Sequence, residues 1–527
     1  MAVDTLPPRA PGPGARLALR DRVAHLRLNR WVIGGLLLVL TLMSLALRTR
    51  QLNFYYWIDE AISVGISSHP LGQLPHLLRN DGSPPLYYLL LHFWMQIFGR
   101  DPVATHWLSL IPALITVPVA YWGGARLFGR RIGAYAAALA AGVPFLTSYA
   151  QETRMYSLLL LLSLLVAVTC VHAFVYRRRR YLPAFSLSLA AALYTHNWAL
   201  FLGLATFLAF LYCAWTAPEP RRGLWREGMI GFGATALLYL PWVPTLLYQA
   251  QHTGAPWTLA PTVWSLSQGF YFITGGRGAA VALLLAAGTG LVALRGARRD
   301  ARRLTRASVA LTITGLGTLL IAWLYAKTTP AWSDRYLAVI VGPLIPLVSM
   351  GLSRARGLGI AALVLVCCFW VLDPRPTSLA AKSNVAPVAH AMSPYVGPTT
   401  LVLSTQPEQV PTLAYYLPKV TRFATPLGVV PDPRVMDWRS ALAKFEHSRV
   451  SRVLAPLVGH MTHGARILLV NPTTYQKAPI WMALIHHDSR SWLFYLEHDR
   501  SLHRVKVAAP GEHGTDLGVQ GTLFTVR

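Results

Sequence analysis

The sequence contains few charged residues, and acidic residues are especially rare. Asp, Glu, Lys and Arg make up 13% of its 527 residues, whereas 54% are hydrophobic. Soluble domains usually carry about 25% charged residues. There are 21 acidic residues against 48 Lys and Arg, which gives a net charge of +27. This shortage of charge excludes an ordinary soluble domain and points to a membrane protein.

Cysteine is also scarce, and its positions exclude a disulfide framework. The four cysteines are Cys170, Cys213, Cys367 and Cys368, all inside apolar runs and without metal-ligand spacing. The excess of Arg does not indicate a nucleic-acid partner. The arginines stand in short clusters between apolar runs, as the positive-inside rule predicts for membrane proteins, instead of along one face of a soluble domain.

Apolar runs near the roughly 20 residues that a bilayer requires recur between Trp31 and Leu372. The sequence predicts eleven crossings. They cover about residues 31–47, 104–124, 132–148, 157–175, 182–195, 198–215, 229–248, 279–294, 307–326, 336–352 and 357–372.

The apolar segment 84–98 is short for a crossing, and the arginine clusters test its placement. If it stays in the first external loop, every later Arg cluster falls on the cytoplasmic side with the N-terminus. If it crosses, those clusters move outside, against the rule. We therefore expect that it does not cross. Arg48 and Arg50 follow the first span on the opposite side, and we expect them at lipid headgroups.

Three regions follow from this pattern. Residues 1–30 read as a disordered cytoplasmic tail, and residues 31–372 as an all-α polytopic membrane domain whose first external loop is 48–103. Residues 373–527 read as an extracytoplasmic α/β domain, with strands at Leu401–Thr405 and Arg466–Asn471 and a helix at Trp438–His447. The expected location is the cell membrane, with the C-terminal domain outside.

This topology gathers polar residues from distant loops at one membrane face. They are Asp59, Glu60, Asp81, Glu152, Arg154, His196, Asn197, Lys327, Asp334 and Arg335. Acidic groups near a bilayer are costly and mark functional sites. A carboxylate there can take a proton from an acceptor hydroxyl, while Arg holds phosphate oxygens in a planar fork. The set therefore suits group transfer from a phosphate leaving group.

Each motif also has a plain structural explanation when it is taken alone. Asp59-Glu60 follows Tyr55-Tyr56-Trp57, which is typical of a solvated loop with an interfacial aromatic belt. Asp81 precedes Pro84-Pro85, as in a turn before a helix. Glu152 suits a helix N-terminus, and Arg154 a snorkelling side chain.

Together the motifs resemble the GT-C glycosyltransferases, and above all the bacterial protein O-mannosyltransferase and aminoarabinose-transferase group. The likeness rests on Asp59-Glu60, on Asp81-Gly82-Ser83-Pro84-Pro85-Leu86, and on three shorter matches. These are Arg154-Met155-Tyr156, Tyr194-Thr195-His196 and Arg335-Tyr336-Leu337. It covers about residues 31–372. Ser83 departs from the pattern, which usually has His at that position.

The resemblance implies that a sugar, a hexose or pentose with mannose included, passes from a polyprenyl phosphate to an acceptor hydroxyl with inversion. Asp59 would be the general base, and Glu60 and Asp81 would orient it or the sugar. The donor phosphate would lie against Arg335 and Arg154, with Tyr156, His196 and Tyr336 beside it. The acceptor could be a glycan, a lipid or a protein. Some members of the wider class use a divalent metal and others do not, and no ligand set here forces one.

Two other classes of protein share some of these features. A transporter or lipid flippase also uses charged residues in a helical bundle, but with ionisable groups at mid-span or broken helices in paired halves. A non-catalytic scaffold would not need the set formed by Asp59, Asp81 and Arg335. The acidic residues here stand at span ends, which favours the transferase.

Overall fold

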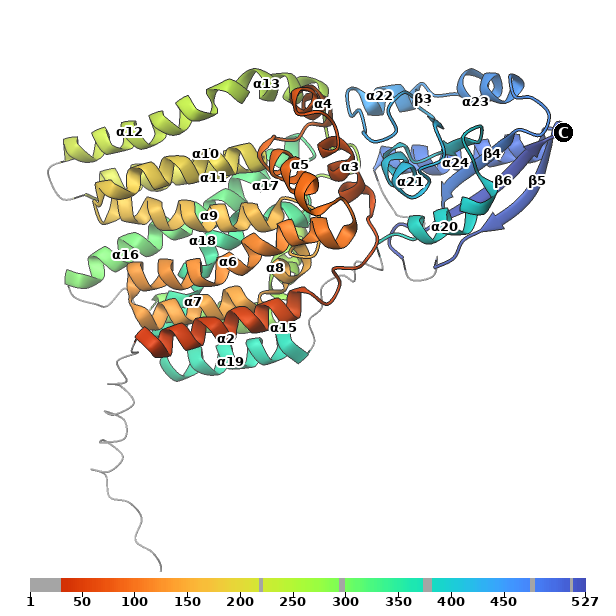
Figure 1. Cartoon of the computed structure of the whole chain (residues 1–527). Helices are drawn as coiled ribbons and strands as arrows, with labels where there is room; N and C mark the ends of the chain where they lie inside the picture. Colours follow the sequence, from red (N-terminus) through yellow and green to blue (C-terminus); the bar gives the residue numbers. More distant parts are fainter. Residues whose placement is uncertain (1–29, 218–220, 293–298, 373–381, 474–478, 512–514) are drawn as a thin grey trace, which may run out of the picture.

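The computed structural model describes residues 30–217, 221–292, 299–372, 382–473, 479–511 and 515–527. It consists of a helical bundle with a mixed α/β domain at one end of it (Figure 1). The predicted fold class, a polytopic helical protein with a C-terminal α/β domain, is confirmed. The predicted tail 1–30 lies outside the described residues except for Arg30.

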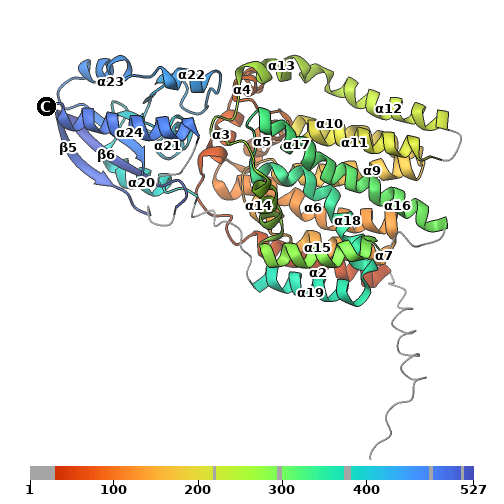
Figure 2. The ribbon, with the colours of Figure 1, turned by 180° about the vertical axis from the view of Figure 1, so that it is seen from behind.

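Long helices run side by side in the bundle (Figures 1 and 2). They are α2 (Arg30–Arg48), α6 (Pro102–Phe128), α7 (Arg130–Gly142), α9 (Tyr156–Cys170), α10 (Leu182–Thr195), α11 (Ala199–Trp215), α12 (Arg221–Tyr239), α15 (Arg277–Val292), α16 (Arg299–Thr312), α17 (Thr318–Thr328), α18 (Ala338–Arg354) and α19 (Arg356–Leu372). Among described residues, six helices are long and apolar enough to cross a bilayer. The pair formed by α14 (Val263–Thr274) and α15, bent by 92°, makes a seventh if it is one span. The chain is thus a multi-pass membrane protein, while the number of eleven crossings stays a prediction.

Local sequence sets the limits of these helices. Asp101 caps α6 by accepting a hydrogen bond from the Ala104 amide at 3.1 Å, and Pro102 fits the first turn, where no amide donor is needed. The helix ends at Gly129, whose φ of +107° favours glycine. Two glycines then let α6 and α7 approach closely, since a Cβ on Gly124 would lie 3.0 Å from the Gly133 Cα.

The basic clusters lie at the end of the bundle away from the C-terminal domain. The turns from α6 to α7 and from α18 to α19 are at this end in Figure 1. Arg306 of α16 donates to the Cys213 carbonyl at the end of α11, and Arg177 pairs with Glu227 of α12. This grouping agrees with the topology that the arginine clusters predicted.

The short apolar segment forms α5 (Leu86–Phe98), which stays at the domain end of the bundle. Pro84, just before it, lines the pocket described below. At its other end, the Arg100 carbonyl accepts a hydrogen bond from Tyr415 of the C-terminal domain at 3.0 Å. Both ends of α5 therefore lie on one side of the bundle, as expected for a segment that does not cross.

Arg48 is not at a lipid headgroup, and this expectation was wrong. Its side chain is fully buried between α2, α6 and α7, where it donates to Ser44 Oγ and to the carbonyl oxygens of Ala113 and Ala140. Three acceptors replace the water that the guanidinium loses on burial, so the charge links three helices.

The C-terminal domain is built on a six-stranded sheet with the order β3-β2-β1-β4-β6-β5. Its strands are β1 (Leu401–Ser404), β2 (Arg422–Thr425), β3 (Gly428–Val430), β4 (Arg466–Pro472), β5 (Leu502–Ala508) and β6 (Val519–Val526). β1 is parallel to β2 and β4, and the other pairs are antiparallel. The two predicted strands are confirmed as β1 and β4. The helix predicted at 438–447 is shorter, α22 (Ala441–Glu446).

Helices cover both faces of this sheet. α20 (Val385–Met392) and α21 (Val410–Tyr416) pack on one face around Val402 and Leu468. α23 (Val450–Gly459) and α24 (Ile480–His498) pack on the other around Leu403 and Leu469. Burial on both faces explains why β1 and β4 are continuous apolar runs without alternation.

Candidate active site

A pocket of about 820 Å³ lies between the domain end of the bundle and the C-terminal domain. Short elements of the segment 48–103 form part of it, namely α3 (Ile58–Ser67) and α4 (Leu74–Asp81). Of the eight residues predicted for the site, six line this pocket: Asp59, Asp81, Arg154, His196, Arg335 and Tyr336. Glu60 and Tyr156 are not among its lining residues.

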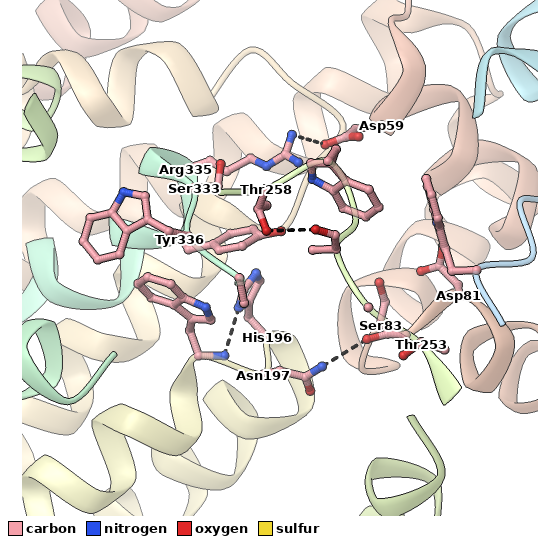
Figure 3. Close-up of a pocket in the computed structure, with 18 of the residues that line it drawn as sticks. Asp59, Asp81, Ser83, His196, Asn197, Thr253, Thr258, Ser333, Arg335 and Tyr336 are labelled. Atoms are coloured by element: carbon pink, nitrogen blue, oxygen red, sulfur yellow. Dashed lines mark hydrogen bonds and ion pairs between the residues drawn. The ribbon is translucent and has the colours of Figure 1, made fainter. Parts of the chain in front are cut away.

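Asp59 lies in the first turn of α3, where the helix dipole favours a negative charge. Its Oδ2 is 2.5 Å from Arg335 Nη1 and 3.9 Å from Arg154 Nη2, and Figure 3 shows the ion pair with Arg335. Burial by itself would raise the pKa of Asp59, but Arg335, Arg154 and Lys382 hold this pKa below its usual value. Asp59 is therefore an ionised carboxylate between two guanidinium groups.

Arg154 is fixed by the loop before α9. Its Nη1 donates to the Asp59 carbonyl at 3.2 Å and to Ser63 Oγ at 2.9 Å. Arg335 comes from the short helix η7 (Asp334–Leu337), at the start of α18, and its guanidinium lies 5.7 Å from the centre of the Trp57 ring. Two distant loops thus bring positive charge to one carboxylate.

Asp81 occupies a different environment at the end of α4. Gly82 follows it with φ +93°, a left-handed conformation that ends the helix and exposes the next residues to the pocket. Burial raises the pKa of Asp81 to about 6, against the opposing effect of the Ser83 hydrogen bond and of Arg154. The two pocket aspartates therefore differ in charge state around pH 6.

Glu60 points away from the pocket, which differs from its predicted place beside Asp59. It is 1% exposed, and its Oε1 lies 2.7 Å from His106 Nε2 and accepts from the Thr153 amide at 2.7 Å. His106 Nδ1 faces the Leu52 carbonyl at 2.7 Å, so both ring nitrogens face oxygens and the ring is held from both sides. Glu60 ties α3 to α6 and to the Arg154 loop.

Aromatic rings form the side of the pocket next to Arg335. His196 and Tyr336 have ring centres 4.8 Å apart, and Tyr156 lies behind Tyr336 at 6.4 Å. Burial and the nearby arginines lower the pKa of His196 to about 3, so this ring is neutral. Its Nδ1 accepts from the Trp198 amide at 3.1 Å, which fixes the ring.

The C-terminal domain supplies a wall that the sequence did not predict. Gln406, Glu408, Trp438, Pro479, Met482 and Leu517 line the pocket from this side. Lys382, just before α20, forms an ion pair with Glu152, and its Nζ lies 4.5 Å from the centre of the Trp57 ring. The sequence placed Glu152 at this membrane face but gave no signal for its partner.

Many polar atoms around the pocket are buried and have no hydrogen-bond partner in the described part of the chain. Seven lining residues carry such an atom: Trp57 Nε1, Arg154 Nε, Asn197 Oδ1, Gln249 Oε1, Trp257 Nε1, Arg335 Nε and Glu408 Oε2. Buried polar atoms are normally paired. Their concentration here, with both donors and acceptors among them, indicates a polar ligand rich in hydroxyl or phosphate oxygens.

The pocket is apolar where it meets the outer surface of the bundle. Leu200, Leu247, Leu259 and Tyr325 line it and are 38–59% exposed. In a membrane protein, such residues face lipid chains. The pocket therefore suits a ligand with a charged head and a long apolar tail. In the part of the chain that the structure describes, no group of three or more His, Cys, Asp or Glu could hold a metal ion.

The chain is similar to one known family in sequence and to several known proteins in structure. Residues 82–248 match the model of the dolichyl-phosphate-mannose-protein mannosyltransferase family. No curated protein sequence matches the chain. ArnT from Cupriavidus metallidurans in the apo state has a similar structure, with a TM-score of 0.59 and 12% identity over 97% of this chain and 98% of that one. The same protein bound to undecaprenyl phosphate gives a TM-score of 0.55.

Two further solved structures share the fold. The mycobacterial arabinofuranosyltransferase AftD has a TM-score of 0.51 and 13% identity over 94% of this chain and 40% of that one. The apo oligosaccharyltransferase of Archaeoglobus fulgidus has a TM-score of 0.50 and 11% identity, over 75% of this chain and 65% of that one. With its family match and its ArnT-like architecture, this multi-pass chain has the GT-C glycosyltransferase fold and is similar to the mannosyltransferases of that superfamily.

Proposed function

We propose that the protein transfers a sugar from a polyprenyl-phosphate donor to an acceptor hydroxyl at the extracytoplasmic face of the cell membrane, with inversion. The observation that carries this proposal is the pocket itself. Two aspartates and two arginines from distant loops converge there, beside an apolar opening to the lipid.

The arginines suit the phosphate of the donor. Arg335 and Arg154 now face Asp59, and a donor phosphate would compete with this carboxylate for the same guanidinium groups. When Arg335 moves to the phosphate, Asp59 loses its strongest ion pair and becomes a better base. The donor would in this way prepare the base for the acceptor.

The chemical step is a single displacement. Asp59 takes the proton of the acceptor hydroxyl, and the oxygen attacks the anomeric carbon from the face opposite the phosphate. The new C–O bond forms as the bond from that carbon to the phosphate oxygen breaks, which inverts the centre. Polyprenyl phosphate leaves with the electron pair, and Arg335 and Arg154 stabilise its added negative charge.

The ends of the molecule suit this orientation. The basic clusters lie at the end away from the C-terminal domain, and positive residues favour the cytoplasmic side. We place the N-terminus inside and residues 373–527 outside, where the donor headgroup and the acceptor meet. The acceptor, a glycan, lipid or protein, enters beside the C-terminal wall.

An assay with the full chain in lipid nanodiscs tests the proposal. Decaprenyl phosphate carrying mannose, glucose or arabinose serves as donor, and released decaprenyl phosphate is measured. Asp59→Asn is expected to lower the rate at least about 100-fold, the usual contribution of a general base. Asp101→Asn is the matched control, since asparagine also caps a helix and Asp101 is outside the pocket lining. Unchanged turnover of Asp59→Asn would reject the assignment of the base.

A further inference from the structure

Three parts of the chain hold the turn that carries Asp81. Gln249 of α13 (Val243–His252) donates from Nε2 to the Leu78 carbonyl at 2.9 Å and to the Ser83 carbonyl at 3.3 Å. Asn197 donates from Nδ2 to the Gly82 carbonyl at 3.0 Å, as Figure 3 shows. The Trp438 amide of the C-terminal domain donates to the Asn80 carbonyl at 3.1 Å.

These contacts determine which way the two amides point. A backbone carbonyl can only accept, so the NH₂ group of each amide must face the turn. The carbonyl oxygen of each side chain is then left over. Asn197 Oδ1 and Gln249 Oε1 are both buried and have no partner among the described residues, and both residues line the pocket. Gln249 is only 3% exposed.

The leftover atoms share one chemical property. Asn197 Oδ1 and Gln249 Oε1 only accept hydrogen bonds, and the ionised Asp81 carboxylate on the same turn does so too. An unpaired buried acceptor costs about 1–3 kcal/mol, and water or a ligand must donate to it. This part of the pocket therefore selects a ligand that presents several O–H donors.

We propose that Asn197, Gln249 and Asp81 form a subsite that binds hydroxyl groups of the donor sugar by accepting their hydrogen bonds. The assignment rests on the proposed function. Asn197 follows His196, whose ring lies 4.8 Å from Tyr336, next to Arg335 and the predicted phosphate position. A sugar attached to that phosphate would reach the amides, whereas an acceptor would approach from Asp59.

The subsite makes the two amides specificity residues for the sugar. A site built to bond a hydroxyl rejects an analogue that lacks it, because its own polar groups then stay unpaired. The wild-type protein should bind the parent glycolipid roughly 10- to 100-fold more tightly than the analogue that lacks the contacted hydroxyl, as expected for one unpaired buried group.

The test compares dissociation constants in nanodiscs for decaprenyl phosphate, decaprenyl-phosphate mannose and its 2-, 3-, 4- and 6-deoxy forms. Where arabinose is the sugar transferred, the arabinosyl series replaces it. Gln249→Leu and Asn197→Ala should each reduce the parent-to-deoxy ratio to below about 3-fold for at least one position, while leaving the affinity for bare decaprenyl phosphate unchanged. Gln96→Leu, an exposed glutamine on α5, is the control and should keep the full ratio.

The ratio separates recognition from a structural effect. A variant that merely loosened the turn would weaken the bare lipid and both glycolipids together, and this result would overturn the proposal. Affinity changes confined to the acceptor would overturn it as well. The turnover of Asp59→Asn is measured in parallel. If Asp59→Asn is inactive but the Gln249 and Asn197 variants keep the full parent-to-deoxy ratio, the subsite alone is rejected. A wild type that neither binds nor turns over any glycolipid rejects the transferase.

Discussion

Two aspartates in one pocket are tuned in opposite directions by what surrounds them. Asp59 lies between Arg335 and Arg154, and these groups outweigh the cost of burial and keep its pKa low. Asp81 has no arginine at ion-pair distance among the described contacts, and burial raises its pKa to about 6. The same residue type therefore gives one carboxylate that is ionised in the resting site and one whose pKa is about 6.

This difference predicts a pH dependence of donor binding. Below about pH 6, Asp81 becomes protonated and loses part of its capacity to accept hydrogen bonds, so the affinity for the glycolipid should fall by several-fold between pH 7 and pH 5. Bare decaprenyl phosphate is not a control for this measurement, because the second pKa of a phosphate monoester is also about 6. Asp81→Asn should bind weakly and without this pH dependence. A full pH dependence in Asp81→Asn would assign it to another group.

A second prediction concerns Arg335, which the pocket offers to the donor phosphate. Arg335→Ala should weaken binding of bare decaprenyl phosphate at least about 10-fold, because a hydrogen bond to a charged group contributes about 1.5–3 kcal/mol. Asp59→Asn should do the reverse and tighten it, since it frees Arg335. The two dissociation constants, measured with the same lipid, check both signs, and equal affinities in all three proteins would contradict the competition.

The motif Asp59-Glu60 shows how far sequence reasoning reached at single residues. The sequence predicted both residues in the site, but only Asp59 lines the pocket. In a helix, neighbouring residues differ by about 100° in direction, so one faces the pocket and the other faces α6. Treating this segment as a loop hid that constraint. Gln249 was missed for another reason: it stands just past an apolar run, and only the packing of α13 on α4 gives it a role.

At the scale of elements, α3 is held in place by a buried pair. Glu60 joins it to His106 of α6 and to the Thr153 amide beside Arg154. The pair thus sets the distance between the element that carries Asp59 and the loop that carries Arg154. The start of α6 is set locally, by the Asp101 cap. The contact between α3 and α6 is not local, and no sequence pattern indicated it.

Removal of Glu60 or His106 should therefore lower the stability of the protein as well as its rate of turnover. Glu60→Ala leaves His106 without its partner, and breaking a buried pair costs about 3–5 kcal/mol. We expect a lower Tm by thermal unfolding in nanodiscs, with turnover lost in the same variant. Glu60→Gln can still accept from the Thr153 amide and should recover most of the Tm. Asp59→Asn keeps an oxygen that can accept from Arg335, so it should lose clearly less Tm than Glu60→Ala. An equal loss in both variants would contradict the distinction between positioning and catalysis.

At the scale of the whole molecule, charge divides the two ends. Arginine clusters occupy one end, and the pocket and C-terminal domain the other. Hydropathy and arginine positions predicted this division, because both act through the bilayer and leave a trace in the linear sequence. The wall formed by Gln406, Glu408 and Trp438 left no such trace, since it depends on how the C-terminal domain packs against the bundle.

Labelling of intact cells tests the orientation. Single cysteines at Lys444 in the C-terminal domain and at Gln96 on α5 should react with a membrane-impermeant maleimide, whereas one at Arg131 should react only after the membrane is opened. All three positions are exposed in the structure. Labelling of position 131 from outside, or protection of position 96, would place the pocket on the wrong side for the proposed reaction.

The position of the C-terminal wall in the chain has a consequence for biosynthesis. The ribosome makes the helices with Asp59, Arg154 and Arg335 before the residues that close the pocket, from Gln406 to Leu517. A nascent chain in the translocon therefore carries an open cavity that already contains its charged groups. The cavity is enclosed only when the sheet of the C-terminal domain packs against the bundle, so the site is completed after its charged groups have been made.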